Sequence, residues 1–316
     1  MSQATLIVNR VLPILLLIGL GYWIHQRRFL SDTAIDDLRK IAVNIALPSV
    51  LFVSFLNIEM EPAYLLLFAL TFVLCLILLG LGSLLKRWLK IDHEYFPFLV
   101  TGFEYGMLGV SLFGAAYGLD AVGTIAVVDL GHEIFIWFVF LALLLKKRDD
   151  LQGAGQLAKV FFQSPVVIAI LLGITFNLLG LQAFLTEGIV SGAIIAALNF
   201  LSNLTVPLIL IIVGYGIKLS AEGLRESLLV TILRLGLLVP LAIAVNALLI
   251  RGALGLGKPF EAAMFTLLVL PPPFIIPLYM RPGDEDERRY VNNVLALHTI
   301  VSLIIFTVYL ILSIYP

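Results

Sequence analysis

Ten apolar stretches, each about as long as a helix that crosses a bilayer, occupy most of this chain. Hydrocarbon about 30 Å thick requires about 20 apolar residues of α-helix. The stretches lie near residues 5–24, 41–58, 63–85, 95–117, 121–145, 160–180, 189–216, 227–250, 261–280 and 290–314. They predict an all-α integral membrane protein with ten transmembrane helices. The composition agrees, because 61% of the residues are apolar and only 13% are charged.

The basic residues predict how these helices are oriented in the bilayer. Loops after odd-numbered stretches hold 16 of the 20 lysines and arginines, whereas loops after even-numbered stretches hold only Arg251 and Lys258. Cytoplasmic loops of membrane proteins carry the excess of basic residues. We therefore expect the odd-numbered loops in the cytoplasm and both termini on the outer face of the cell (inner) membrane.

The two halves of the chain, residues 1–150 and 151–316, share residues at matching spacings. The matches are Pro13 and Gly21 with Pro165 and Gly173, Asn44 and Pro48 with Asn203 and Pro207, and His132 with His298. They predict a duplicated unit of five helices, with helix breaks at the asparagine–proline pairs of the second and seventh stretches. An odd number of spans inverts the second copy, which gives the 5+5 inverted repeat of many secondary transporters.

Two segments are expected to interrupt the fourth and ninth helices. Residues 103–112 read FEYGMLGVSL and residues 268–280 read LVLPPPFIIPLYM, and an offset of 166 residues aligns 108–112 with 274–278. Glycine frees the backbone and proline removes an amide donor. Unwound backbone at membrane depth is tolerated only inside protein or against a water-filled cavity, where half-helix ends hold ions and carboxylates. The candidate binding residues are Tyr105, Gly106, Gly109, Pro271, Pro272 and Pro273, with a further helix break at Pro277; ordinary proline kinks are the alternative.

The chain resembles the auxin efflux carrier family, whose bacterial members include dicarboxylate permeases. The resemblance runs nearly end to end and is carried by residues 45–52 (IALPSVLF), 105–112 (YGMLGVSL), the proline-rich ninth stretch and 292–304 (NNVLALHTIVSLI). It implies a scaffold from spans one, two, six and seven and a transport domain from spans three to five and eight to ten. It also implies that broken helices four and nine cross at the substrate site.

The fourth stretch departs from the family pattern Asn-x-Gly-x-x-Gly-x-Pro. Gly106 and Gly109 are kept, but Glu104 stands in the asparagine place and Ser111 in the proline place. The missing proline weakens the expectation that this helix is fully broken. An ionised carboxylate at this depth is costly, so Glu104 should be neutral, paired or bound to a cation. A structural bond to a neighbouring helix is the alternative.

Further ionisable residues lie inside apolar stretches. Asp129, His132 and Glu133 share one face of the fifth helix. Because histidine exchanges protons near neutral pH, this cluster suggests a proton relay, with a buried structural network as the alternative. His298 is either the symmetry mate of His132 or a core histidine. Arg234 either pairs with an acid of the fourth or fifth helix or binds an anionic substrate.

These observations favour a secondary active transporter of small organic anions (carboxylates) that works by alternating access. Protons are the expected coupling ion, through Glu104 and the fifth-helix cluster, and Na⁺ is the alternative. A non-transporting membrane sensor is a further alternative. No enzyme, cofactor or metal site is expected, since no nucleophile-and-base pair is evident. The expected partners are the organic anion and the lipid bilayer, with a homodimer left open and nucleic acid excluded by the balanced charge of 20 basic and 21 acidic residues.

Overall fold

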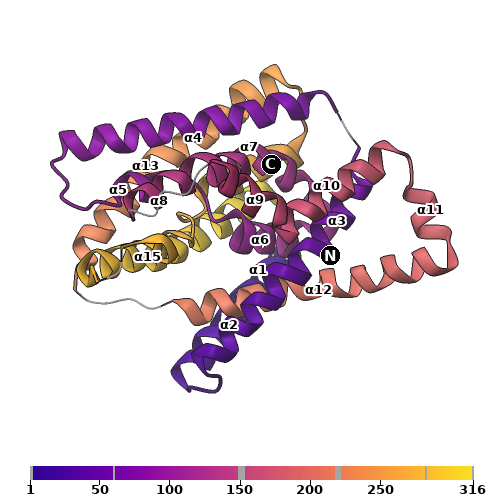
Figure 1. Ribbon diagram of the computed structural model, residues 1–316, viewed down its shortest axis with the longest axis horizontal. Coiled ribbons are helices and arrows are strands. Elements are labelled where there is room, and N and C mark those ends of the chain that lie inside the picture. Colours follow the sequence, from indigo (N-terminus) through magenta and orange to yellow (C-terminus); the bar gives the residue numbers. More distant parts are fainter. Residues whose placement is uncertain (1–2, 60, 149–153, 218–221, 282, 315–316) are drawn as a thin grey trace.

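The computed structural model describes residues 3–59, 61–148, 154–217, 222–281 and 283–314, and within them every regular element is helical (Figure 1). The helices of the first half are α1 (Gln3–Gln26), α2 (Asp32–Ile41), η1 (Ala42–Ala46), α3 (Leu47–Asn57), α4 (Ala63–Trp88), α5 (Phe96–Val100), η2 (Tyr105–Gly109), α6 (Val110–Tyr117), η3 (Leu119–Ala121), α7 (Val122–Phe135), η4 (Ile136–Phe140) and α8 (Leu141–Lys147). Those of the second half are α9 (Ala154–Gln163), α10 (Pro165–Leu178), α11 (Gln182–Glu187), α12 (Ile189–Gly216), α13 (Leu224–Val245), η5 (Asn246–Ala253), α14 (Lys258–Val269), η6 (Ile276–Tyr279) and α15 (Glu285–Ile314).

Seven of the described helical segments are long and apolar enough to cross a membrane. They are Asp32–Asn57, Ala63–Trp88, Phe96–Tyr117, Leu119–Lys147, Ile189–Gly216, Leu224–Ala253 and Glu285–Ser313, and Val11–Gln26 and Pro165–Leu178 are shorter apolar helices. The prediction of an all-helical, multi-pass membrane protein is therefore confirmed. The count of ten spans and the inverted repeat stay predictions. The predicted boundary between the repeats, at residues 150 and 151, lies outside the described residues.

The predicted helix breaks have different outcomes. Helix α12 continues through Pro207, so no break lies there. Near Pro48 the chain stays helical, and the wider π-helical turn η1 directly precedes α3. Such a turn accommodates a residue that lacks an amide donor. The Asn44 side chain meanwhile donates to the Lys40 carbonyl at 2.9 Å. Pro277 lies within the short 3₁₀ turn η6, just after a true interruption of the ninth stretch.

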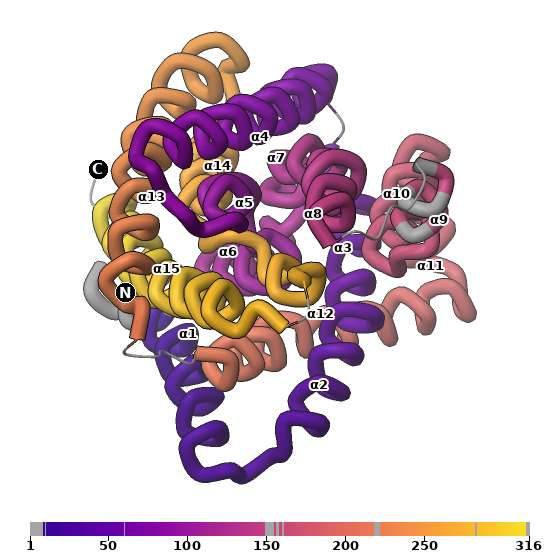
Figure 2. The backbone as a smooth tube through the Cα atoms, turned by 60° about the vertical axis from the view of Figure 1, so that its left-hand side comes forward, coloured from indigo at the N-terminus to yellow at the C-terminus, as the bar shows by residue number. Residues whose placement is uncertain are grey.

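Two groups of helices form the bundle (Figure 2). In the first group, α1 packs against α12 and α3 packs against α10. Glycines allow these close crossings. A Cβ on Gly21 would meet the α12 backbone at Ile211, and a Cβ on Gly173 would lie 2.8 Å from the Phe52 carbonyl oxygen of α3. These two glycines are the ones that the spacing of the two halves aligns.

In the second group, α4 packs against α7, α13 packs against α14 and α15, and α14 also contacts α7. The segment Phe96–Tyr117, which contains α5, η2 and α6, is the most deeply buried of the candidate spans, with 83% of its apolar window inside the protein. Helix α6 contacts α1 and α12 of the first group and α7 of the second. The interrupted helix therefore lies where the two groups meet.

Candidate substrate and ion site

The two interrupted helices touch each other at their breaks. Helix α5 ends at Val100 and the chain becomes helical again at Tyr105, while α14 ends at Val269 and η6 begins at Ile276. Between these ends, the Glu104 amide donates to the Pro271 carbonyl at 2.9 Å. The chain is thus non-helical between α5 and η2 and between α14 and η6, and these two breaks lie in direct contact.

The break in the fourth stretch lies earlier than the glycine pattern indicates. Gly106 and Gly109 belong to the π-helical turn η2 rather than to the break. The residue that requires backbone freedom is Gly102, whose φ is +72° and where a Cβ would lie 2.8 Å from the Pro273 ring. Gly109 has a packing role, since a Cβ there would lie 2.8 Å from Leu270 of the other break. Sequence reasoning missed Gly102, although a glycine two residues before Glu104 was visible.

The Glu104 carboxylate bonds to backbone amides of both interrupted helices. One oxygen accepts from the Phe274 amide at 2.6 Å and the other from the Met107 amide at 3.2 Å. The side chain caps the start of η2 and is 7% exposed. Amides at a helix start carry positive partial charge and stabilise a carboxylate. Among the described residues, no basic side chain forms an ion pair with Glu104, so backbone amides stabilise this carboxylate.

Arg234 of α13 donates hydrogen bonds to backbone carbonyls at the C-terminal ends of α5 and α14, the helices that precede the two breaks. Its guanidinium donates to the Leu99 carbonyl at 2.9 Å, to the Gly102 carbonyl at 2.5 Å and to the Leu270 carbonyl at 3.2 Å. It also lies 5.2 Å above the Phe103 ring and is fully buried. Within the described residues it forms no ion pair with an acid, which was one of the two roles that the sequence suggested. The carbonyls at helix C-termini carry the negative partial charge that Arg234 neutralises.

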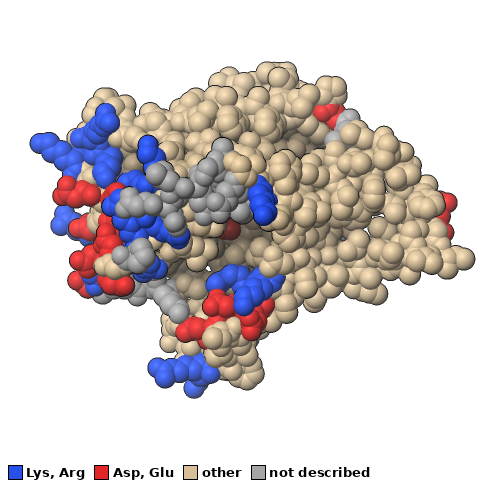
Figure 3. All heavy atoms as spheres, viewed as in Figure 1, with Lys and Arg blue, Asp and Glu red and all other residues tan. Residues whose placement is uncertain are grey.

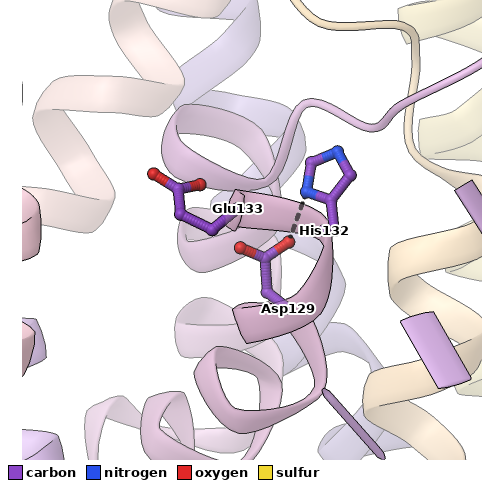
Figure 4. Close-up of side chains that lie close together, drawn as sticks. All are labelled: Asp129, His132 and Glu133. Carbon is purple, nitrogen blue, oxygen red and sulfur yellow. Dashed lines mark hydrogen bonds and ion pairs between the residues drawn. The ribbon is translucent and has the colours of Figure 1, made fainter. Parts of the chain in front are cut away.

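The cluster on α7 holds the break of the fourth stretch in place (Figure 4). The Phe103 amide donates to His132 Nε2 at 2.9 Å, and His132 Nδ1 lies 2.8 Å from an Asp129 oxygen. Because Nε2 accepts, the proton of a neutral ring lies on Nδ1 and is donated to Asp129. Glu133 points away from His132 and accepts from Trp137 Nε1 at 2.8 Å. A metal ion among these three residues would have to displace one of the bonds of His132.

His298 makes an equivalent connection to the other break. Its Nδ1 lies 2.9 Å from Ser302 Oγ, which donates to the Val269 carbonyl at 2.5 Å. His132 bonds to residue 103 and His298 reaches residue 269, and both pairs of residues differ by 166 positions. The Nε2 atom of His298 is buried and has no hydrogen-bond partner among the residues that the structure describes. The structure therefore brings each histidine to the interrupted helix of its own half of the chain.

Tyr105 and Pro272 are also buried at this crossing, and within the described part of the chain the Tyr105 hydroxyl has no hydrogen-bond partner. The crossing thus gathers Glu104, Arg234, His132 and the three prolines 271–273 from four separate parts of the chain.

A cavity of about 630 Å³ opens between α3, α7 and α12. Its polar lining residues are Ser54, Asn57, Asp120, Thr124, Asn199, Ser202 and Asn203. No lysine, arginine or histidine is among its described lining residues. Of the predicted site residues only Asn203 lines it. The positions 199, 202 and 203 fall on one face of α12, a polar pattern in an apolar helix that could have indicated the cavity.

Comparison with known proteins agrees with the resemblance in the motifs. The family described as Membrane transport protein matches residues 6–160. An uncharacterized transporter of Methanothermobacter thermautotrophicus is 26% identical over 304 residues, which cover 93% of this chain and 94% of that protein. Both point to a transporter and not to an enzyme. Over residues 6–160 the chain is therefore similar to the family of membrane transport proteins.

Proposed function

We propose that this protein is a secondary active transporter that moves a small organic anion by alternating access and couples its movement to protons through Glu104. The observation that carries the proposal is the buried Glu104 carboxylate, which accepts from one amide of each interrupted helix. In other secondary transporters, half-helix ends of this kind bind anionic substrates. In this protein the Glu104 side chain accepts the hydrogen bonds of the Met107 and Phe274 amides.

The coupling follows from competition for these amides. While Glu104 is ionised, it holds the Met107 and Phe274 amides, and a substrate carboxylate has no donors there. When Glu104 takes up a proton, its affinity for the amides falls, and the substrate carboxylate replaces it. One proton then accompanies one carboxylate, so a monoanion crosses without net charge movement.

The helix packing supports alternating access. The first group contains α1, α3, α10 and α12, which lie in the predicted spans one, two, six and seven. The second contains α4, α7, α13, α14 and α15, which lie in the predicted spans three, five, eight, nine and ten. The cavity is lined by α3 and α12 from the first group and by α7 from the second. Movement of one group against the other would therefore change access to it.

Sodium coupling has less support from the geometry. A sodium site at unwound helices requires free carbonyl oxygens. The carbonyls of Leu99, Gly102 and Leu270 accept from Arg234, and the Pro271 carbonyl accepts from the Glu104 amide.

The cavity favours a second candidate class of substrate. Its lining holds one acid, Asp120, and several amides and hydroxyls, but no base. Such a lining suits an uncharged or cationic polar solute, or an amino acid, as well as a carboxylate that bonds to amide donors.

Uptake into proteoliposomes tests the proposal. Labelled carboxylates, amino acids and amines are supplied separately, with a pH gradient or a sodium gradient imposed alone. We expect a carboxylate to accumulate under a pH gradient and not under a sodium gradient. Accumulation of an amine only, or of any solute under the sodium gradient alone, would contradict the proposal.

A further inference from the structure

A second cavity, of about 370 Å³, lies at the end of α4 and is lined mainly by charged side chains. The charged lining residues are Lys86, Arg87, Lys90, Asp92, Glu94 and Lys147, and we call this cavity the basic pocket. Lys86 and Arg87 belong to the last turn of α4, Lys90 follows it, and Lys147 ends α8. The basic pocket is separate from the crossing of the interrupted helices.

Three of the four cations in the basic pocket have no ion-pair partner among the described residues. Lys147 pairs with Glu94 at 2.7 Å, and Arg281 lies 3.7 Å from the same carboxylate. Lys86, Arg87 and Lys90 form no ion pair or side-chain hydrogen bond with another described residue. Cations at a helix C-terminus and in a cytoplasmic loop are common, which explains their sign. This general preference does not explain why three cations without an ion-pair partner line the same basic pocket.

The basic pocket adjoins a surface that faces lipid. Helix α4 is a candidate membrane span, and near its end Leu84 is 39%, Trp88 73% and Leu89 49% exposed. Exposed tryptophan is typical of the boundary between hydrocarbon and headgroups. In Figure 3, basic side chains gather at the left end of the molecule, where α4 ends in Figure 1. The cations thus lie at the depth of lipid headgroups.

We propose that the basic pocket binds the phosphate headgroup of an anionic phospholipid, whose acyl chains lie along the exposed apolar end of α4. By the distribution of basic residues, this end faces the cytoplasm, where the leaflet carries anionic lipids that basic clusters attract. A soluble phosphate could meet the same cations, but it would leave the adjoining apolar surface unused. Pro97, in the first turn of α5, also lines the basic pocket, so the lipid braces the start of the interrupted fourth helix.

Association of spin-labelled phosphatidylglycerol with the full-length protein in phosphatidylcholine vesicles tests this proposal. The test variant is K86Q/R87Q/K90Q. The control is R28Q/R39Q/K40Q, which removes the same number of charges from the segment between the first two predicted spans, which is also predicted to be cytoplasmic. In α2 of that segment, Arg39 and Lys40 already pair with Asp36 and Asp37. Thermal unfolding of each variant verifies that it is folded.

We expect the wild type and the control to prefer phosphatidylglycerol over phosphatidylcholine. The test variant should lose most of that preference, because three cations that attract anionic lipid are removed. Equal preference in the wild type and the test variant would overturn the proposal. Loss of the preference in 10 mM inorganic phosphate, but not in sodium chloride of equal ionic strength, would also overturn it and indicate a site for a soluble anion.

Discussion

Two buried side chains of opposite charge each serve both interrupted helices. Glu104 accepts from amides of the two segments, and Arg234 donates to carbonyls of the same two segments. Each charge therefore meets backbone groups of the opposite partial charge, and neither needs the other as a partner. Of the two, only the Glu104 carboxylate can lose its charge by taking up a proton. Glu104 is therefore the residue suited to proton coupling.

Glu104→Gln should separate exchange from coupling. The amide side chain is permanently neutral and resembles the protonated acid, so substrate should still exchange across the membrane in counterflow. Uptake driven by a pH gradient should be abolished, because no proton is released. Both assays use the same vesicles, with Glu187→Gln on the exposed surface as the control. Undiminished pH-driven uptake would remove Glu104 from the mechanism and move the coupling role to Asp129, His132 and Glu133.

Arg234→Gln should mainly destabilise the protein. It leaves three buried carbonyls without their donor, each of which costs about 1–3 kcal/mol. We expect a clear fall in the thermal unfolding midpoint in detergent, together with loss of transport. If Arg234 instead binds the substrate anion, the variant will keep the wild-type midpoint and lose only substrate binding, and the structural role argued above will be wrong.

The loop between α4 and α5 contacts α13 and α15 through His93, and it connects helices of the second group at one end. His93, in the loop between α4 and α5, lies 2.8 Å from Glu287 at the start of α15 and 3.2 Å from Glu226 in the first turn of α13. Its ring stacks on Tyr290, with centroids 3.4 Å apart. Since both ring nitrogens face carboxylates, the doubly protonated ring satisfies both contacts. This loop thereby joins helices of the two halves of the chain.

His93→Gln should cost more stability at acidic pH than at alkaline pH. Burial lowers the pKa of His93, but hydrogen bonds and charges from Glu287 and Glu226 outweigh it and raise the pKa above the usual value. A raised pKa stabilises the folded state fully below the unfolded value of about 6.5, and this contribution is lost as the pH rises through the folded-state value. The difference in unfolding midpoint between wild type and variant, measured from pH 5.5 to 9, should shrink as the pH rises. A constant difference would show that protonation is not involved.

The crossing of α1 and α12 can be tested with two glycines of one helix. Gly21→Ala would place a Cβ against the α12 backbone, whereas a Cβ on Gly19 would meet nothing within 4 Å. Overpacking of this kind costs about 1–3 kcal/mol. Gly21→Ala should therefore lower the unfolding midpoint, and Gly19→Ala should leave it unchanged or raise it. Equal effects of the two substitutions would mean that the close crossing is absent.

At the scale of the whole molecule, the charged loops predict which end faces the cytoplasm. Residues 1–2 and 315–316 lie outside the described part of the chain, so loop positions are the better probes of orientation. In a Cys75→Ala background, Glu61→Cys should react with an impermeant thiol reagent from outside the cell. Asp36→Cys should react only after permeabilisation. The reverse pattern would show that the predicted orientation is inverted.

The sequence by itself determined that the chain is a helical membrane protein and that two helices are interrupted. These features follow from local properties: apolar runs of membrane length, the loops that hold the basic residues, and the glycines and prolines that prevent continuous helix. Interruption of the ninth stretch at residues 270–275 and of the fourth at 101–104 was foreseeable to within a turn.

Only the tertiary structure decided which groups meet at the crossing. Glu104 reaches an amide 170 residues away, and Arg234 reaches a carbonyl 135 residues away. The sequence indicates which side chains are charged. Backbone amides and carbonyls occur at nearly every residue, so the sequence does not indicate which of them will bond to a charged side chain. The sequence therefore suggested an acid or a substrate anion as the partner of Arg234, whereas the fold gives it the carbonyls of two helix ends.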